Sequence, residues 1–197
     1  QSIEGYGNIE IKDTLQTSQS LYAIIQTDSE FGDIETDKDS VAIAKITPLG
    51  ALEKIMVLPS RLPLTFINSR LDATGLVVMT KTKENILVFD IDINLNKSNT
   101  LTLPLSESGR LFTGLDGTLI LTQGAQNIVY RMGDNLKTGF LPSGEIVEIY
   151  DFYQYILIFI NTPSGYRIVR LSNNLTPTKN VLMSGSKILS ITPIFEG

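Results

Sequence analysis

Two carboxylates at short spacing are the first residues in this sequence whose arrangement could do chemistry. Asp90 and Asp92 stand two positions apart in a stretch that alternates polar and apolar residues. In a β-strand, this alternation puts both carboxylates on one face, about 6.6 Å apart. That separation suits the acid and base of a glycoside hydrolase. Any half-exposed strand shows the same alternation, so the pair alone does not assign an activity.

A denser group of carboxylates lies between residues 28 and 39. Oxygen ligands on a flexible loop suit Ca²⁺, which binds six to eight of them. The ordered spacing of an EF-hand is absent, and a solvated loop extended by its own charge repulsion explains the same composition. The candidate calcium ligands are Asp28, Glu30, Asp33, Glu35, Asp37 and Asp39.

The residue types that the chain lacks exclude several classes of enzyme and metal site. The chain contains no His and no Cys. It therefore cannot form a Ser-His-Asp triad, a cysteine nucleophile, a disulfide, or a metal centre ligated by His or thiolate. Glycine-rich dinucleotide and phosphate loops are absent too. Apart from calcium, we expect no cofactor.

Charge and hydropathy narrow the choice of partners. The net charge is −5, whereas a nucleic-acid binder needs a basic surface, so we expect no nucleic-acid partner. The longest apolar run, residues 155–160, is far shorter than the roughly 20 residues that span a bilayer, so we expect no membrane insertion. The sequence begins with Gln1 rather than Met. Either removal of a leader or trimming of the chain would explain this. The first would make the protein an exported one, and we expect an extracytoplasmic or cell-surface location.

A repeated pattern of strands must position these candidate residues. Apolar runs recur at residues 21–26, 75–80, 117–122 and 155–160. Each run is followed by a polar loop and then by an alternating strand. These alternating strands are expected at residues 41–46, 86–91, 128–132 and 166–171. No segment shows sustained helical periodicity, which predicts an all-β protein.

Two further landmarks follow each alternating strand. The first is a turn, at Asn94-Leu95, Asn135-Leu136 and Asn174-Leu175, with Pro48-Leu49 in the first copy. We expect Asn to adopt the positive φ and Leu to fold back onto the sheet. The second landmark is an outer strand that ends in Leu-Pro at residues 58–59, 103–104 and 141–142. Pro lacks the N–H group that would invite pairing at a sheet edge.

These landmarks recur in the same order, and the chain resembles a β-propeller, whose blades have four strands in about 40 to 45 residues. The resemblance is to the generic repeat, since the motifs of the named propeller families are missing. It implies blades at about residues 18–62, 63–108, 109–144 and 145–186. A β-sandwich or barrel is the alternative.

The pattern contains five expected innermost strands but only four copies of each of the other three strands. They are expected at residues 7–12, 63–68, 109–113, 145–150 and 187–193. We predict that the strand at 187–193 completes the first blade and closes a four-bladed ring, because an exposed strand would be an aggregation edge. Residues 1–17 are then an N-terminal arm or extra strand. Alternatively, the last strand begins a further blade of a larger propeller.

One face of such a propeller gathers the loops between second and third strands and the links between blades. That face commonly carries the ligand. The ligand-binding residues expected there are Arg61, Lys81, Lys83, Glu107 and Arg110. An aromatic cluster at residues 150–155 could stack on a sugar ring or fill the space between blades.

No assembled reaction chemistry accompanies this scaffold, so we predict no catalytic residue. The sequence favours a non-catalytic binding or assembly module that recognises protein or glycan. A carbohydrate-active enzyme with paired carboxylates on the loop face is one alternative. A structural subunit of a homo-oligomer or filament, with a donated N-terminal strand, is another.

Overall fold

The computed structural model contains only β-strands and their connections. It describes residues 9–28, 39–71, 75–96, 98–114, 117–124, 126–132, 136–152, 154–185 and 187–191. Within these residues, sixteen strands form four antiparallel sheets of four strands each. This confirms the predicted all-β class and the four sets of four strands. No helix capable of spanning a membrane occurs in the described residues.

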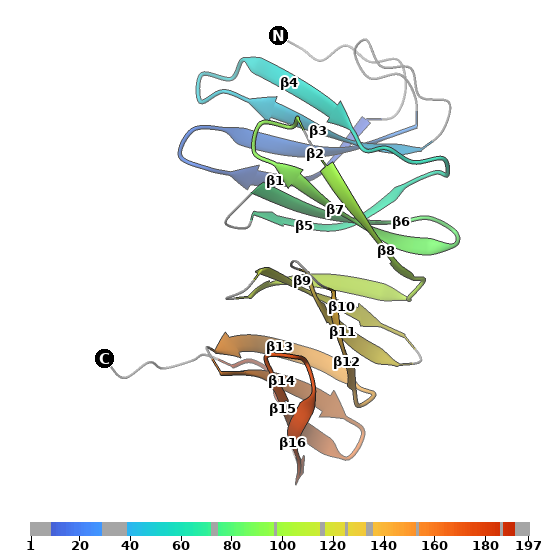
Figure 1. The fold of residues 1–197 in the computed structure, drawn as a ribbon, viewed down its shortest axis with the longest axis vertical. Helices are drawn as coiled ribbons and strands as arrows, with labels where there is room; N and C mark the ends of the chain where they lie inside the picture. Colours follow the sequence, from blue (N-terminus) through green and yellow to red (C-terminus); the bar gives the residue numbers. More distant parts are fainter. Residues whose placement is uncertain are drawn as a thin grey trace. The chain divides into compact units, whose positions relative to one another are not determined.

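Each sheet is a meander in which consecutive strands pair in chain order (Figure 1). Sheet 1 contains β1 (Ile9–Gln16), β2 (Leu21–Thr27), β3 (Ser40–Ile46) and β4 (Leu52–Val57). Sheet 2 contains β5 (Thr65–Leu71), β6 (Gly75–Lys81), β7 (Asn85–Asp92) and β8 (Ser98–Pro104). Sheet 3 contains β9 (Ser108–Gly114), β10 (Gly117–Gln123), β11 (Asn127–Arg131) and β12 (Lys137–Leu141). Sheet 4 contains β13 (Glu145–Phe152), β14 (Tyr155–Thr162), β15 (Gly165–Ser172) and β16 (Pro177–Ser184).

The second strand of each sheet is the apolar run seen in the sequence. In β6, the four residues from Leu76 to Met79 are fully buried, although their side chains alternate between the two faces. A strand buried on both faces needs apolar residues at consecutive positions rather than at alternate ones. This requirement explains why these runs predict the second strands so well.

The chain divides into two compact units, Gln1–Ser106 and Glu107–Gly197. In the first unit, facing sides of sheets 1 and 2 share one buried cluster. In the second unit, sheets 3 and 4 do the same. Each fully buried Leu, Ile or Phe contributes about 1.5–3 kcal/mol, so these two interfaces are the main source of stability. The first cluster includes Tyr22, Ile24, Val41, Ile43, Leu76, Val78, Phe89, Ile91 and Leu95. The second includes Leu119, Leu121, Val129, Ile156, Ile158, Ile160, Val169, Leu171 and Leu175.

The turns between third and fourth strands correct the sequence prediction. We expected Asn to adopt the positive φ, but Leu95 (φ 54°) and Leu175 (φ 60°) do so instead. A left-handed conformation costs a non-glycine residue about 1–2 kcal/mol. Both Leu side chains are buried between the two sheets of their unit, and that burial offsets the cost.

In the turn between β3 and β4, a glycine rather than a leucine has the positive φ. Gly50 has φ 81° and its N–H group donates to Thr47 O, 2.9 Å away. Leu49, which we expected to fold back onto the sheet, is 97% exposed. Without a buried side chain to offset the strain, the left-handed position is occupied by the residue that adopts it freely.

The two chain ends also differ from the prediction. We expected residues 187–193 to complete the first sheet and residues 1–17 to be an arm or extra strand. Instead, β1 is the first strand of sheet 1 and pairs with β2, while residues 187–191 form no strand. β1 and β2 are joined by a short turn in which Thr17 N–H donates to Ser20 O. Closing so short a loop costs less entropy than recruiting a strand from the far end of the chain.

Candidate functional site

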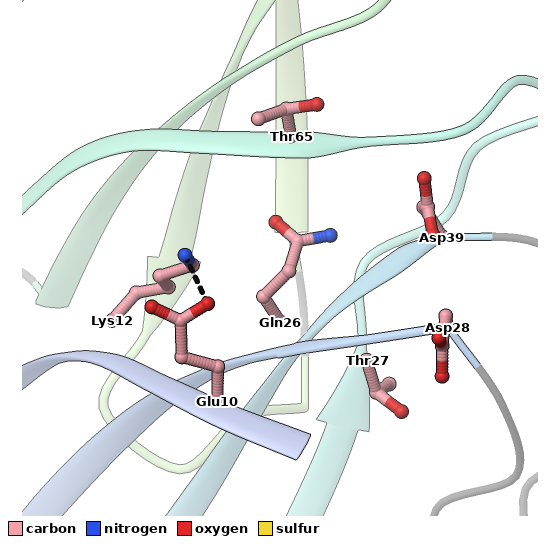
Figure 2. Close-up of a pocket in the computed structure, with 7 residues that line it drawn as sticks. All are labelled: Glu10, Lys12, Gln26, Thr27, Asp28, Asp39 and Thr65. Carbon is pink, nitrogen blue, oxygen red and sulfur yellow. Dashed lines mark hydrogen bonds and ion pairs between the residues drawn. The ribbon is translucent and has the colours of Figure 1, made fainter. Parts of the chain in front are cut away.

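A cavity of about 270 Å³ lies at the end of sheet 1 where the second strand leaves for the third. Figure 2 shows its lining, with Gln26 pointing toward the strand that carries Thr65. Glu10 and Lys12 form an ion pair at one side. The lining residues are Glu10, Lys12, Gln26, Thr27, Asp28, Asp39 and Thr65.

Two predicted calcium ligands, Asp28 and Asp39, line this cavity. Glu30, Asp33, Glu35 and Asp37 lie outside the described residues. Within the described part of the chain, no group of three or more acidic side chains is arranged to hold a metal ion. The calcium site therefore stays a prediction.

Three of the predicted ligand-binding residues lie in the first unit. Arg61, Lys81 and Lys83 are exposed residues of the first unit. In the part of that unit that the structure describes, no hydrogen bond or ion pair joins them to one another, and Lys83 instead lies 3.9 Å from Glu84. The ligand-binding role of these three cations stays a prediction.

The two predicted site residues of the second unit are Glu107 and Arg110, both exposed. Arg110 has a structural contact: its Nη1 donates to Ile146 O in β13 at 3.1 Å. Its guanidinium also lies 4.9 Å from the centre of the Phe112 ring. Arg110 therefore links sheet 3 to the first strand of sheet 4.

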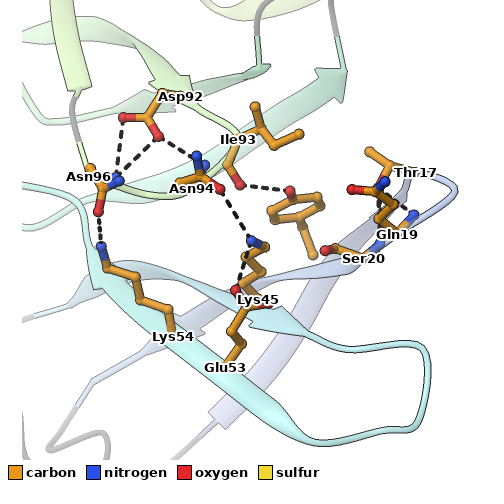
Figure 3. Close-up of polar contacts among 11 residues, drawn as sticks. Thr17, Gln19, Ser20, Lys45, Glu53, Lys54, Asp92, Ile93, Asn94 and Asn96 are labelled. Atoms are coloured by element: carbon orange, nitrogen blue, oxygen red, sulfur yellow. Dashed lines mark hydrogen bonds and ion pairs between the residues drawn. The ribbon is translucent and has the colours of Figure 1, made fainter.

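Asp92, half of the suspected acid/base pair, is the last residue of β7, and its side chain binds the turn that follows. Its Oδ1 accepts hydrogen bonds from the N–H groups of Asn94 (2.8 Å) and Asn96 (3.3 Å). Figure 3 shows this turn beside sheet 1, where Lys45 Nζ donates to Asn94 Oδ1 at 3.5 Å. From sheet 1, Tyr22 OH also donates to Ile93 O at 2.7 Å. These contacts make the turn a junction between sheets 1 and 2.

The opposite end of sheet 1 holds a contact that the sequence analysis missed. Gln26 Nε2 donates to Leu64 O at 2.7 Å, and Phe66 N–H donates to Gln26 Oε1 at 2.9 Å. One side-chain amide on β2 thus binds the backbone where the chain enters β5, the first strand of the next sheet. We call a side-chain amide that binds the backbone in this way an amide clamp.

Two amide clamps lie in the described residues of the second unit. Asn127 Nδ2, in sheet 3, donates to Pro142 O and Gly144 O, where the chain enters β13. Asn161, in sheet 4, binds Ile188 through both groups: its Nδ2 donates to Ile188 O at 2.8 Å, and Ile188 N–H donates to its Oδ1 at 2.9 Å.

Register relates the clamps of sheets 1 and 4. Gln26 pairs with Glu10, next to the bulge in β1, and Asn161 pairs with Glu145, next to the bulge in β13. The two amides therefore stand at equivalent positions. A signal was available in the sequence, since an amide residue directly follows, or ends, these apolar runs. It was missed because a polar residue at a strand end is unremarkable by itself.

The face of sheet 4 turned away from sheet 3 carries aromatic side chains, and we call it the aromatic face. Its rings contact one another: Tyr150 lies 6.1 Å from Phe159, and Phe152 lies 5.1 Å from Tyr155. Arg170 lies 4.3 Å from the centre of the Tyr155 ring. The register adds further members to this face. All members are only half-buried: Tyr150, Phe152, Tyr155, Leu157, Phe159, Tyr166 and Ile168.

Residues 187–191 lie along part of this aromatic face. Besides the Asn161 clamp, Tyr150 OH donates to Ile191 O at 3.1 Å. Burial raises the pKa of the Tyr150 phenol above its ordinary value, and the nearby charge of Glu148 raises it further. The phenol is therefore held in its neutral form, which is the form that donates this hydrogen bond.

No protein-family model matches the chain, and no curated protein is similar to it in sequence.

Proposed function

We propose that the chain is a non-catalytic binding or assembly module, that its four sheets are consecutive blades of a β-propeller, and that it recognises protein. The junction between sheets supports the propeller architecture. In the first unit, β5 contacts β1, and in the second unit β13 contacts β9. The first strands of neighbouring sheets thus meet in both units, as the innermost strands of propeller blades do around their axis.

The aromatic face of sheet 4 is the observation that carries the binding role. The equivalent face of sheet 1, with Tyr22 and Ile24, is fully buried by sheet 2. In sheet 3, Leu119 and Leu121 are likewise buried against sheet 4. The aromatic face keeps its side chains half-exposed, and an apolar surface of this kind marks a site of protein interaction.

The cavity at the end of sheet 1 favours a second candidate function. Three carboxylates, Glu10, Asp28 and Asp39, line it. A carbohydrate-active enzyme needs two carboxyl groups about 5–10 Å apart across the bond that it cleaves. Lys12 and Thr65, which also line the cavity, would supply the polar contacts that orient a sugar.

One experiment separates the two candidates. The full chain is tested for retention on a panel of immobilised glycans and for release of reducing sugar from soluble oligosaccharides. If the chain recognises protein, we expect neither retention on the glycans nor release of reducing sugar. Release of sugar that Asp39→Asn abolishes would contradict the proposal and establish the enzyme. Retention that Tyr155→Ala abolishes would also contradict it, because the aromatic face would then bind glycan.

A further inference from the structure

Sheet 4 binds residues 187–191 in the way that sheet 1 binds the start of β5. In both cases a side-chain amide of the sheet binds the backbone of the segment. On sheet 1, the amide of Gln26 binds the backbone where β5 begins. On sheet 4, the equivalent amide of Asn161 binds Ile188. In the first case the clamped segment continues into a four-stranded sheet that covers the face of sheet 1.

The side chains of this segment have the spacing of a first strand. In β13, Ile146 and Ile149 flank a bulge and are both buried against sheet 3. Ile188 and Ile191 have the same three-residue spacing and are half-buried, whereas Leu189 between them is 94% exposed. The segment therefore presents two isoleucines to the aromatic face and a leucine away from it.

Within the part of the chain that the structure describes, one edge of the segment's backbone is engaged. Asn161 binds both the N–H and the C=O group of Ile188, as a neighbouring strand would. In extended backbone, the groups of the next residue point to the opposite edge. In β5, that opposite edge pairs with β6 through Thr65, which stands opposite Lys81. The corresponding edge of the C-terminal segment is the one at Leu189.

We infer that residues 187–191 accept an apolar β-strand from a partner protein, which pairs antiparallel along the Leu189 edge and covers the aromatic face. The inference rests on the proposed function and names the chemistry of its partner. The partner strand resembles β6. The reason is that β6 pairs with β5, and the start of β5 is bound by an amide clamp just as Ile188 is. Backbone hydrogen bonds supply the affinity, and apolar side chains contact Leu157 and Phe159.

A fluorescent peptide with the sequence of residues 75–81, extended by two lysines for solubility, tests the inference by anisotropy against the full chain. We expect saturable binding with a dissociation constant below about 0.5 mM. Leu189→Pro removes the N–H group at the pairing edge and weakens binding about tenfold or more. Leu189→Thr keeps that group on a good strand former and leaves the affinity within about twofold. Leu189 is exposed, so both variants should unfold at the wild-type urea concentration.

Absence of saturable binding, or equal binding by the two variants, overturns the inference. A concentration-dependent dimer of the chain that Leu189→Pro abolishes also overturns it, because the occupant is then a second copy. The proposed function stands or falls separately, on the glycan experiment.

Discussion

Arg131 and Asp151 form an ion pair between sheets 3 and 4, with Arg131 Nη2 2.7 Å from Asp151 Oδ2. Both side chains are almost completely buried, at 3% and 2% exposure. A charge buried without its partner is strongly destabilising, whereas the intact pair gains little over apolar residues of similar size. We therefore expect the pair to determine which sheets pack together more than it stabilises their packing.

Removing one member of this pair should be costly. Arg131→Met leaves the Asp151 carboxylate buried and uncompensated, and we expect it to lower the free energy of unfolding by about 3–5 kcal/mol. The double variant Arg131→Met/Asp151→Leu should recover most of the loss. Urea denaturation measures both. A double variant as unstable as the single one would show that the charges themselves stabilise the junction.

Truncation of Leu175, which has a left-handed backbone conformation, tests how much its side chain stabilises the packing of sheets 3 and 4. Leu175 packs so closely on β12 that a Cβ atom at Gly139 would lie 2.9 Å from the Leu175 Cβ. Leu175→Ala leaves a cavity and should cost about 2–5 kcal/mol in the free energy of unfolding. Leu136→Ala, in the matching turn of sheet 3, is the control because Leu136 is 45% exposed. Equal costs for the two variants would contradict the packing role.

The amide clamp of sheet 1 should have a measurable cost of removal. Gln26→Ala leaves Phe66 N–H and Leu64 O without this partner, and unsatisfied buried groups cost about 1–3 kcal/mol. Lys81 stands at the equivalent register position of sheet 2 and is exposed. Lys81→Ala should therefore change stability very little. Thermal unfolding of both variants checks the difference, and similar melting temperatures would argue against the clamp.

The raised pKa of Tyr150 predicts a stability loss in alkali. Above pH 10 the phenol ionises in the unfolded chain but stays protonated in the folded one, so unfolding becomes more favourable as pH rises. The contribution is fully present below pH 10 and is lost as pH rises through the folded pKa. Urea titrations of Tyr150→Phe should show a shallower alkaline decline than the wild type. An identical decline would mean that the phenol is not shielded.

The regular part of the fold could be predicted from the sequence because its cause is local. The run around Val77 and Val78 must form a strand buried on both faces, and the same reasoning applies to its counterparts. The left-handed position of Leu95 could not be predicted, because only its burial between two sheets makes the strain tolerable. Local sequence rules assign that position to Asn or Gly.

The arrangement of the chain ends and the partners of the amide clamps could not be predicted, because both depend on contacts between residues far apart in the sequence. Residues 9–16 and 187–191 both have the pattern of a first strand, and only the short connection to β2 decides which of them enters sheet 1. The role of Asn161 depends on a partner 27 residues away in the sequence. A side-chain amide at a strand end carries no local sign of such a partner.

Amide hydrogen exchange at residues 188 and 189 tests whether residues 187–191 are clamped to sheet 4 and accept a further strand. In the free chain, Ile188 N–H should exchange slowly because it donates to Asn161 Oδ1, while Leu189 N–H should exchange rapidly. Asn161→Ala should release Ile188, and addition of the strand peptide to the wild type should slow Leu189. Rapid exchange of Ile188 in the wild type, or no effect of the peptide on Leu189, would contradict the description of this segment as a clamped first strand whose Leu189 edge has no partner strand among the described residues.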